Sequence, residues 1–276
     1  MVDERNLKII KRKSYSKHIS AFLFIIFLYF IYSLVENPRF GWDIVGKYLF
    51  NEAIMSGLLL AVCLTVICMV IGVVLGIIIA FFKVSNVFFL EKIAQLYIWF
   101  FRGTPILVQL IFWYNLSALY PSLYIHIPFL DVDFFKFTTN DLITPLIAAI
   151  LGLSLNEGAY MSEIVRGGIL SVDSGQEEAA TSLGMKKIKI MLRIILPQAM
   201  RTIIPPTGNE TIGMLKMTSL VSVISLSDLL YAAQSIYSRN FETIPLLLVT
   251  CFWYLVMTTI MTFFQEKVER HYHYST

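Results

Sequence analysis

The chain has 276 residues, of which 57% are hydrophobic and 15% charged, and its mean hydropathy is +0.70. A soluble domain carries about 25% charged residues, so this composition excludes an ordinary soluble protein and predicts an integral membrane protein. The net charge of +3 provides no basic footprint for nucleic acid, and we expect no nucleic-acid partner.

The first apolar stretch, residues 19–35, follows a basic segment, and a cleaved signal peptide is the alternative to a membrane helix. The stretch has 17 residues, whereas the apolar region of a signal peptide has about 7–15. Residues 36–39 (Glu-Asn-Pro-Arg) provide no small-residue cleavage site. We therefore predict a retained membrane helix, which together with its basic tail and an external linker makes up residues 1–52.

Five further apolar runs reach the length of about 20 residues that a helix needs to cross a bilayer. They are residues 53–82, 93–118, 142–165, 194–226 and 243–264. We predict an all-α integral membrane protein with six transmembrane helices, a core over residues 53–264 and a polar tail over residues 265–276. Pro205 and Pro206 are expected to interrupt the hydrogen bonding of the fifth span.

Lysine and arginine residues orient these helices, because cytoplasmic segments of membrane proteins are enriched in both. With both termini in the cytoplasm, the inner segments hold 15 Lys and Arg residues and the outer segments hold 4. We therefore predict that both termini are cytoplasmic. The outer loop over residues 119–141 is expected to cap a cavity or to contact an external partner.

Small residues inside the apolar runs predict where two membrane helices pack closely against each other. Gly72, Gly76 and Ala80 share one helix face, which we expect to pack against another helix of the same chain. A seam between two copies is the alternative.

The cysteines lack the spacing of metal ligands, so we expect buried small hydrophobic residues and no metal site. They are Cys63, Cys68 and Cys251.

The longest predicted cytoplasmic loop covers residues 166–193. Ser174, three residues before Glu177, is expected to cap a short helix over residues 175–183, and Gly184 allows the turn that ends it. Such a helix suits docking into a groove on a soluble partner. A helix that rests on lipid headgroups is an equal alternative on physical grounds.

The same loop carries a motif. Glu178-Ala179-Ala180, followed by Gly184, Ile194 and Leu196-Pro197, resembles the coupling-loop motif of the permease subunits of ATP-binding cassette (ABC) importers. The resemblance implies that residues 173–190 form a coupling helix that fits a cleft on an ATP-binding subunit. The residues that it assigns to coupling are Gly175, Glu178, Ala179, Ala180, Leu183, Gly184, Ile194, Leu196 and Pro197.

Further segments resemble permeases for polar amino acids, the family that takes up His, Glu, Gln, Arg and opines. These segments begin with residues 101–105 (Phe-Arg-Gly-Thr-Pro), 158–160 (Gly-Ala-Tyr) and 205–206 (Pro-Pro). The resemblance implies a five-helix permease core plus one extra N-terminal helix. Position 217 is Met, where the family often has a carboxylate beside the lysine.

The resemblance also implies a mechanism, in which a polar amino acid enters a bacterial cytoplasm through the inner membrane by alternating access. Two ATP-binding subunits would bind ATP and Mg²⁺. A second permease copy, identical or related, would complete the route, and an extracytoplasmic solute-binding protein would deliver the solute. This chain has no phosphate-binding Gly-x4-Gly-Lys-Ser/Thr loop, so we expect no ATPase site, enzyme activity or cofactor in it.

Ionisable side chains within membrane spans are costly and usually face a cavity or a partner. At 100° per residue, Asn156, Glu157, Tyr160 and Glu163 fall within an arc of about 120° on the fourth span. We expect the passage to be lined by Arg102, Gln109, Asn156, Glu157, Tyr160, Asn209, Glu210 and Lys216. A structural network that ties helices together is the alternative, and it is favoured for Arg102 and Arg201.

An ion-coupled secondary carrier is the alternative for the whole protein, because such carriers also contain broken helices and buried carboxylates. Such carriers usually show internal repeats, and this sequence shows none. A carrier without an ATPase would also have no use for a coupling loop.

Overall fold

The computed structural model describes residues 16–85, 87–127 and 132–273, most of which are helical, so the predicted helical class is confirmed. The helices up to residue 119 are α1 (Ser16–Glu36), η2 (Pro38–Phe40), α2 (Trp42–Tyr48), α3 (Glu52–Lys83), α4 (Phe88–Gly103), α5 (Ile106–Tyr114) and α6 (Leu116–Leu119). Those that follow are α7 (Thr139–Leu142), α8 (Pro145–Leu170), α9 (Ser174–Ser182), α10 (Lys187–Ile190), η3 (Met191–Ile195), α11 (Leu196–Met217), η4 (Thr218–Ile224), α12 (Leu229–Asn240) and α13 (Thr243–His273). Most of the predicted basic tail lies outside the described residues.

Polar caps fix where several of these helices begin. The Asn51 side chain accepts a hydrogen bond from the Ala53 amide at the start of α3. Thr144 caps α8, whose first residue is Pro145, and Asp228 caps α12 through the amides of residues 230 and 231. Each cap satisfies amide donors that the first helical turn leaves unpaired.

The centre of the bundle is the contact between α3 and α8. A Cβ atom added at Gly76 would lie 2.9 Å from the backbone carbon of Met161, and one added at Gly72 would lie 2.6 Å from Cγ of Glu157. The absence of side chains at these positions therefore allows the two helix backbones to approach closely. The prediction that this face packs within the chain is confirmed.

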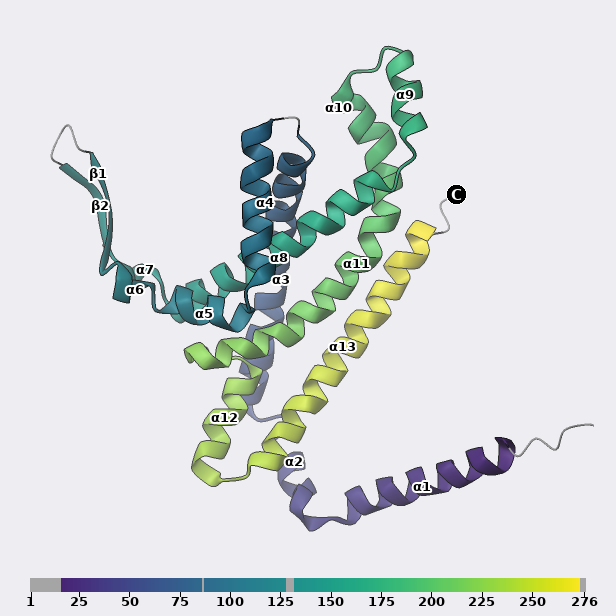
Figure 1. Ribbon diagram of the computed structural model, residues 1–276. Helices are drawn as coiled ribbons and strands as arrows, with labels where there is room; N and C mark the ends of the chain where they lie inside the picture. Colours follow the sequence, from purple (N-terminus) through teal and green to yellow (C-terminus); the bar gives the residue numbers. More distant parts are fainter. Residues whose placement is uncertain (1–15, 86, 128–131, 274–276) are drawn as a thin grey trace, which may run out of the picture.

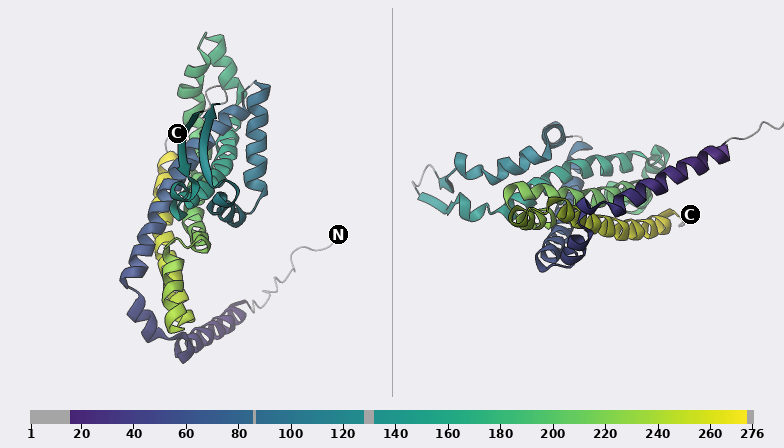
Figure 2. Two further views of the ribbon diagram at one scale, coloured as in Figure 1. Left: turned by 90° about the vertical axis from the view of Figure 1, so that its left-hand side faces the viewer. Right: turned by 90° about the horizontal axis from the view of Figure 1, so that it is seen from below.

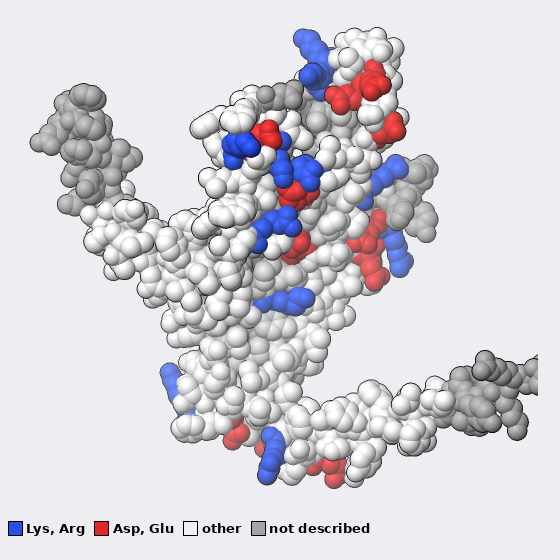
Figure 3. Space-filling model, viewed as in Figure 1, with Lys and Arg blue, Asp and Glu red and all other residues white. Residues whose placement is uncertain are grey.

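The helices α3, α8, α11 and α13 form an elongated bundle (Figure 1). The short helices α9 and α10 lie at one end of it, and α2 and α12 lie at the other. On the face shown in Figure 3, charged side chains extend from the α9 end to about the middle of the bundle and reappear at the other end, with an uncharged band between them. The apolar helix α1 extends away from the bundle in each view (Figure 2), and none of its apolar stretch is buried.

Fewer helices than predicted cross a membrane by length and hydropathy alone. Three described helices qualify singly, within α1, α3 and α13. Two bent pairs qualify jointly: α4 with α5, at an angle of 101°, and the segment Lys187–Ile224 with α12, at 45°. The 26 residues of α8 span about 39 Å at 1.5 Å per residue, which is enough for a bilayer. The count of six stays a prediction.

The helix breaks lie elsewhere than predicted. The α11 helix continues through Pro205 and Pro206. The two prolines lack amide donors, so the predicted loss of hydrogen bonding there stands, but the break in the helix that we expected is wrong. A proline removes its own amide donor and frees the carbonyl four residues earlier, which a spanning helix tolerates when neighbouring groups satisfy it. Gln265 of α13 contacts this part of α11, where its Nε2 donates to the Pro205 carbonyl at 3.3 Å. The sharp break instead separates α4 from α5 at residues 104–105, within the predicted span 93–118.

The predicted outer loop contains a β-hairpin that the sequence pattern did not predict. Strand β1 (Ser122–Ile127) pairs antiparallel with β2 (Val132–Thr138), with Ser122 opposite Thr138 and Ile127 opposite Val132. The hairpin projects from the bundle beyond α6 and α7 (Figure 1). The loop between the two strands lies outside the described residues.

The three cysteines differ in burial. Cys68 is buried in the core, but Cys63 and Cys251 are exposed, so the expectation that all three are buried is wrong for two of them. In a bilayer, an exposed apolar position on a spanning helix faces lipid, which accepts a thiol as readily as a protein core does.

Candidate functional site

The loop between α8 and α11 forms a short helix that ends in a left-handed turn. Helix α9 begins one residue earlier than predicted, and its cap is Asp173, not Ser174: the Asp173 carboxylate accepts a hydrogen bond from the Gly175 amide at 2.8 Å. Asp173 precedes the helix and has the extended backbone that an N-cap requires, whereas Ser174 is already helical. Gly184 has a φ of 75°, which favours glycine and ends the helix.

Two apolar residues of this loop, Ala180 and Leu183, differ in burial. Ala180 is 3% exposed and packs with Ile190 and Ile195, which anchors the loop to the start of α11. Leu183 is 83% exposed. The loop is therefore fixed to the bundle through Ala180, whereas Leu183 remains accessible.

The other coupling residues surround this pair. Gly175, Glu178 and Ala179 are exposed on α9, and Pro197 is exposed near the start of α11. Ile194 and Leu196 are half-buried beside the π-helical turn η3. Such turns widen a helix locally and occur frequently at functional sites.

Glu157 is buried near the middle of α8 without a partner. Its side chain is 1% exposed, and neither carboxylate oxygen has a hydrogen-bond partner among the described residues. It faces α3, where Gly72 leaves room for it. Burial of a carboxylate without a partner is costly, so Glu157 is a functional candidate rather than a packing residue.

Arg102, Tyr160 and Glu210 lie near Glu157. We call these four residues the central cluster. The Arg102 guanidinium lies over the Tyr160 ring, 4.9 Å from its centroid. Arg102 also attracts the Glu210 carboxylate electrostatically, and Glu210 repels Glu157. Helices α4, α8 and α11 thus bring two carboxylates and one guanidinium together within the bundle.

Two predicted passage residues hold the break between α4 and α5. Nδ2 of Asn156 donates to the Phe101 carbonyl at 2.7 Å, and Nε2 of Gln109 donates to the same carbonyl at 3.0 Å. Gln109 also donates to Thr104. Both side chains are 5% exposed. Their contacts satisfy carbonyl groups that the bend releases. This role is structural, and it is compatible with the alternative in which these polar residues tie helices together instead of lining a passage.

The remaining predicted residues lie apart from the central cluster. Asn209 accepts a hydrogen bond from Gln265 of α13 at 3.1 Å, and Lys216 is exposed at the end of α11. Arg201 is exposed as well. The structure therefore brings Arg102, Tyr160 and Glu210 together with Glu157, and it separates Asn209 and Lys216 from them.

An ion triad that includes a residue missed in the sequence ties α3 to α8. Glu163 contacts Nζ of Lys83 at 2.5 Å and the Arg166 guanidinium at 2.8 Å. The polar face of α8 predicts a partner for Glu163, but Lys83 is distant in sequence, so no local pattern identifies it. Gly72 was predicted as a packing residue, but its position opposite Glu157 was not predicted, because that depends on which helix lies opposite.

Comparisons with known proteins agree with this geometry. Residues 72–274 match a protein family described as the inner membrane component of binding-protein-dependent transport systems. The arginine transport system permease protein ArgU of Corynebacterium glutamicum is 45% identical over 92% of this chain and 78% of its own length. The L-cystine transport system permease protein TcyB of Bacillus subtilis is 34% identical, over 89% of this chain and 97% of its own length.

A solved structure shares the fold. The crystal structure of an amino acid ABC transporter with histidines contains a chain that superposes with a TM-score of 0.70 at 34% sequence identity. The match covers 83% of this chain and 98% of that chain.

Proposed function

The chain belongs to the family of inner membrane components of binding-protein-dependent transport systems, and from this premise we propose that it forms the permease of an ABC importer for a cationic amino acid. Relatives in this family that resemble the chain are permease subunits, and ATP is hydrolysed by a separate subunit. The cationic solute is the new element of the proposal.

The charge balance of the central cluster carries this choice of solute. The cluster contains two carboxylates, Glu157 and Glu210, but only one guanidinium, Arg102. A cationic amino acid has the complementary set of two cations and one carboxylate. A neutral amino acid would leave one carboxylate of the cluster uncompensated in a region of low dielectric constant. The name of the 45% identical relative, an arginine permease, supports the same class.

The accessible members of the cluster are suited to contact the solute. Arg102 is exposed and Glu210 and Tyr160 are half-buried, whereas Glu157 is buried behind them. The solute carboxylate would pair with Arg102, and a solute cation would pair with Glu210 or stack on Tyr160. Glu157 has no partner within the bundle, and the solute cation would compensate it.

The partners follow from the same proposal. The transporter contains two ATP-binding subunits, and one of them contacts the α9 helix of this chain in the cytoplasm. A solute-binding protein docks on the outside. The exposure of Leu183 beside the anchored Ala180 supports the first of these contacts. A second permease copy completes the passage, because Arg102 is exposed on a single chain. Both termini lie in the cytoplasm, as the distribution of lysine and arginine favours.

Uptake by the assembled transporter in proteoliposomes tests the choice of solute. Glu157→Gln and Glu210→Gln each remove one negative charge at nearly constant volume. We expect Glu210→Gln to lower L-arginine uptake about tenfold or more, because a hydrogen bond to a charged group contributes about 1.5–3 kcal/mol and about 1.4 kcal/mol is a factor of ten. Glu157→Gln should lower uptake less, because Glu157 is buried behind the residues that contact the solute.

The matched control is Glu266→Gln, which removes an exposed carboxylate on α13 outside the cluster and should leave uptake unchanged. L-glutamine serves as the neutral comparison solute. If the cluster variants reduce the uptake of L-arginine and L-glutamine equally, the two carboxylates do not select a cation and the proposed solute class is wrong.

A further inference from the structure

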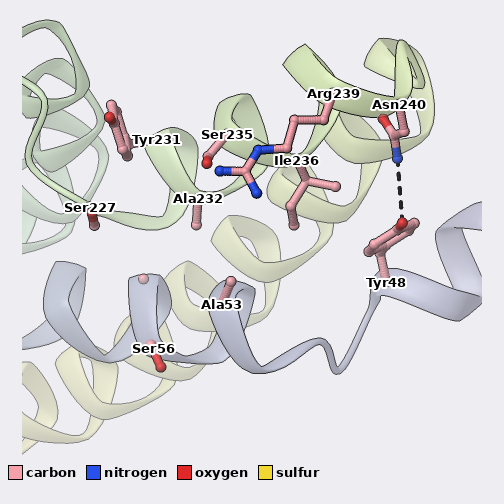
Figure 4. A pocket seen from close by; sticks show the side chains of 11 residues that line it. Tyr48, Ala53, Ser56, Ser227, Tyr231, Ala232, Ser235, Ile236, Arg239 and Asn240 are labelled. Carbon is pink, nitrogen blue, oxygen red and sulfur yellow. Dashed lines mark hydrogen bonds between the residues drawn. The ribbon is translucent and has the colours of Figure 1, made fainter.

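A separate cavity lies at the end of the bundle opposite α9. It has a volume of about 480 Å³ and is enclosed by α12 on one side and the beginning of α3 on the other (Figure 4). A hydrogen bond of 3.4 Å from Asn240 to the Tyr48 hydroxyl closes one end (Figure 4). Gly57 keeps the two walls close, because a Cβ atom there would lie 2.6 Å from the Asp228 carbonyl oxygen.

Arg239 supplies a single positive charge to this cavity. Its guanidinium turns back along α12 toward Ser235 and lies between α12 and α3 (Figure 4). Arg239 has no ion pair or hydrogen bond with any residue that the structure describes. No acidic residue lines the cavity among the described residues, so no carboxylate of the chain neutralises it.

The remaining polar groups of the lining complement the same ligand. The hydroxyls come from Ser56, Ser227, Tyr231 and Ser235. Hydroxyl groups can donate to an anion, and a guanidinium binds a carboxylate through two parallel hydrogen bonds. The nearby Asp228 is buried, and its oxygens already accept the amides of α12, so it does not compete for Arg239.

We propose that this cavity is a carboxylate-binding site for a small amino-acid solute, separate from the central cluster and formed by Arg239 with Ser235 at its centre. The volume is sufficient for an amino acid. The site lies at the outer end of the transporter, an assignment that rests on the proposed function. It would hold the solute by its α-carboxylate before the solute reaches the central cluster.

Chemical labelling of Arg239 in the transporter assembled with its ATP-binding subunits tests this site without depending on transport. Phenylglyoxal modifies exposed guanidinium groups, and peptide mass spectrometry reports the labelling rate at each arginine. The probes are L-arginine, glycine and agmatine, which is arginine without its carboxylate. Arg39, also exposed, is the internal control.

L-arginine and agmatine consume phenylglyoxal themselves, so the readout is the labelling rate of Arg239 relative to that of Arg39. We expect L-arginine and glycine to lower this relative rate and agmatine to leave it unchanged. At a probe concentration of about four times its dissociation constant, the rate should fall about fivefold, because only the free site reacts. Ser235→Ala should raise the concentration needed for protection. Ser238→Ala, on the same helix but outside the lining, should not.

Three results would overturn the proposal: equal protection by agmatine, no protection by any probe, or no labelling of Arg239 because the assembled transporter covers the cavity. The result is independent of the proposed solute. If glycine and L-arginine protect Arg239 but the transporter imports no cationic amino acid, the carboxylate site stands and the proposed function fails.

Discussion

Single residues determine how closely the helices of this bundle pack, and one of them, Glu157, lowers its stability. Gly72 and Gly76 allow α3 and α8 to touch along their backbones, and the same closeness buries the Glu157 carboxylate beside Gly72. A buried carboxylate without a partner costs stability. On the proposed function, a cationic solute offsets that cost, which explains why the bundle keeps the carboxylate at this depth.

Gly76→Ala tests the packing at the residue scale. The added methyl group would lie 2.5 Å from Cβ of Met161 and 2.9 Å from the Ser162 backbone nitrogen, and the backbone cannot move aside as a flexible side chain would. We expect a loss of about 1–3 kcal/mol in the free energy of unfolding, as in other overpacked cores, measured as a lower melting temperature in detergent.

The control is Gly167→Ala on α8, where an added Cβ meets nothing within 4 Å. Alanine favours a helix over glycine by about 0.5–1 kcal/mol, so this variant should melt at the same temperature or slightly higher. Equal melting of the two variants would mean that α3 and α8 are not packed as described.

The residue scale also shows where prediction from the sequence ends. A helical wheel places Asn156, Glu157, Tyr160 and Glu163 on one side of α8, yet each has a different neighbour. Asn156 contacts a released carbonyl, Glu157 faces a glycine, Tyr160 stacks under Arg102, and Glu163 pairs with Lys83. The wheel describes one helix, whereas these roles depend on which helix lies opposite.

At the scale of elements, the loop between α8 and α11 was predictable because its signals are local. A polar cap, a helix of suitable length and a glycine at the end appear within about a dozen residues, and α9 differs from the predicted helix by one residue. The breaks in the long helices were less predictable. Thr104-Pro105 bends the chain and Pro205-Pro206 does not. At the bend, the released Phe101 carbonyl accepts hydrogen bonds from Asn156 of α8 and Gln109 of α5, and such contacts depend on tertiary packing.

Leu183→Ser tests the role of α9. The side chain is 83% exposed, so its loss should not change the melting temperature of the permease. We expect the solute-stimulated ATP hydrolysis of the assembled transporter to fall about tenfold, because truncation of a central interface residue typically costs more than 1 kcal/mol.

Leu119→Ser is the matched control, since it replaces an exposed leucine (63%) on α6, away from α9. It should leave ATP hydrolysis unchanged. Normal stimulation in the Leu183 variant would instead favour the alternative in which α9 rests on lipid headgroups.

At the scale of the whole molecule, three features follow one another along the bundle. The Arg239 cavity lies at one end, α9 lies at the other, and the central cluster lies within the bundle. A transporter that receives solute at one end and couples to an ATPase at the other requires this order. The helical class and the loop are visible in the sequence, but this arrangement depends on long-range packing and was not.

Uptake of L-arginine into proteoliposomes is the most direct test of the central claim that this chain is the permease of an ATP-driven importer. The vesicles contain the chain with its ATP-binding subunits and a solute-binding protein. We predict uptake that requires ATP and the ATP-binding subunits and that persists when a protonophore removes the proton gradient. Uptake by the chain alone, abolished by the protonophore while ATP is present, would identify an ion-coupled carrier and contradict the account.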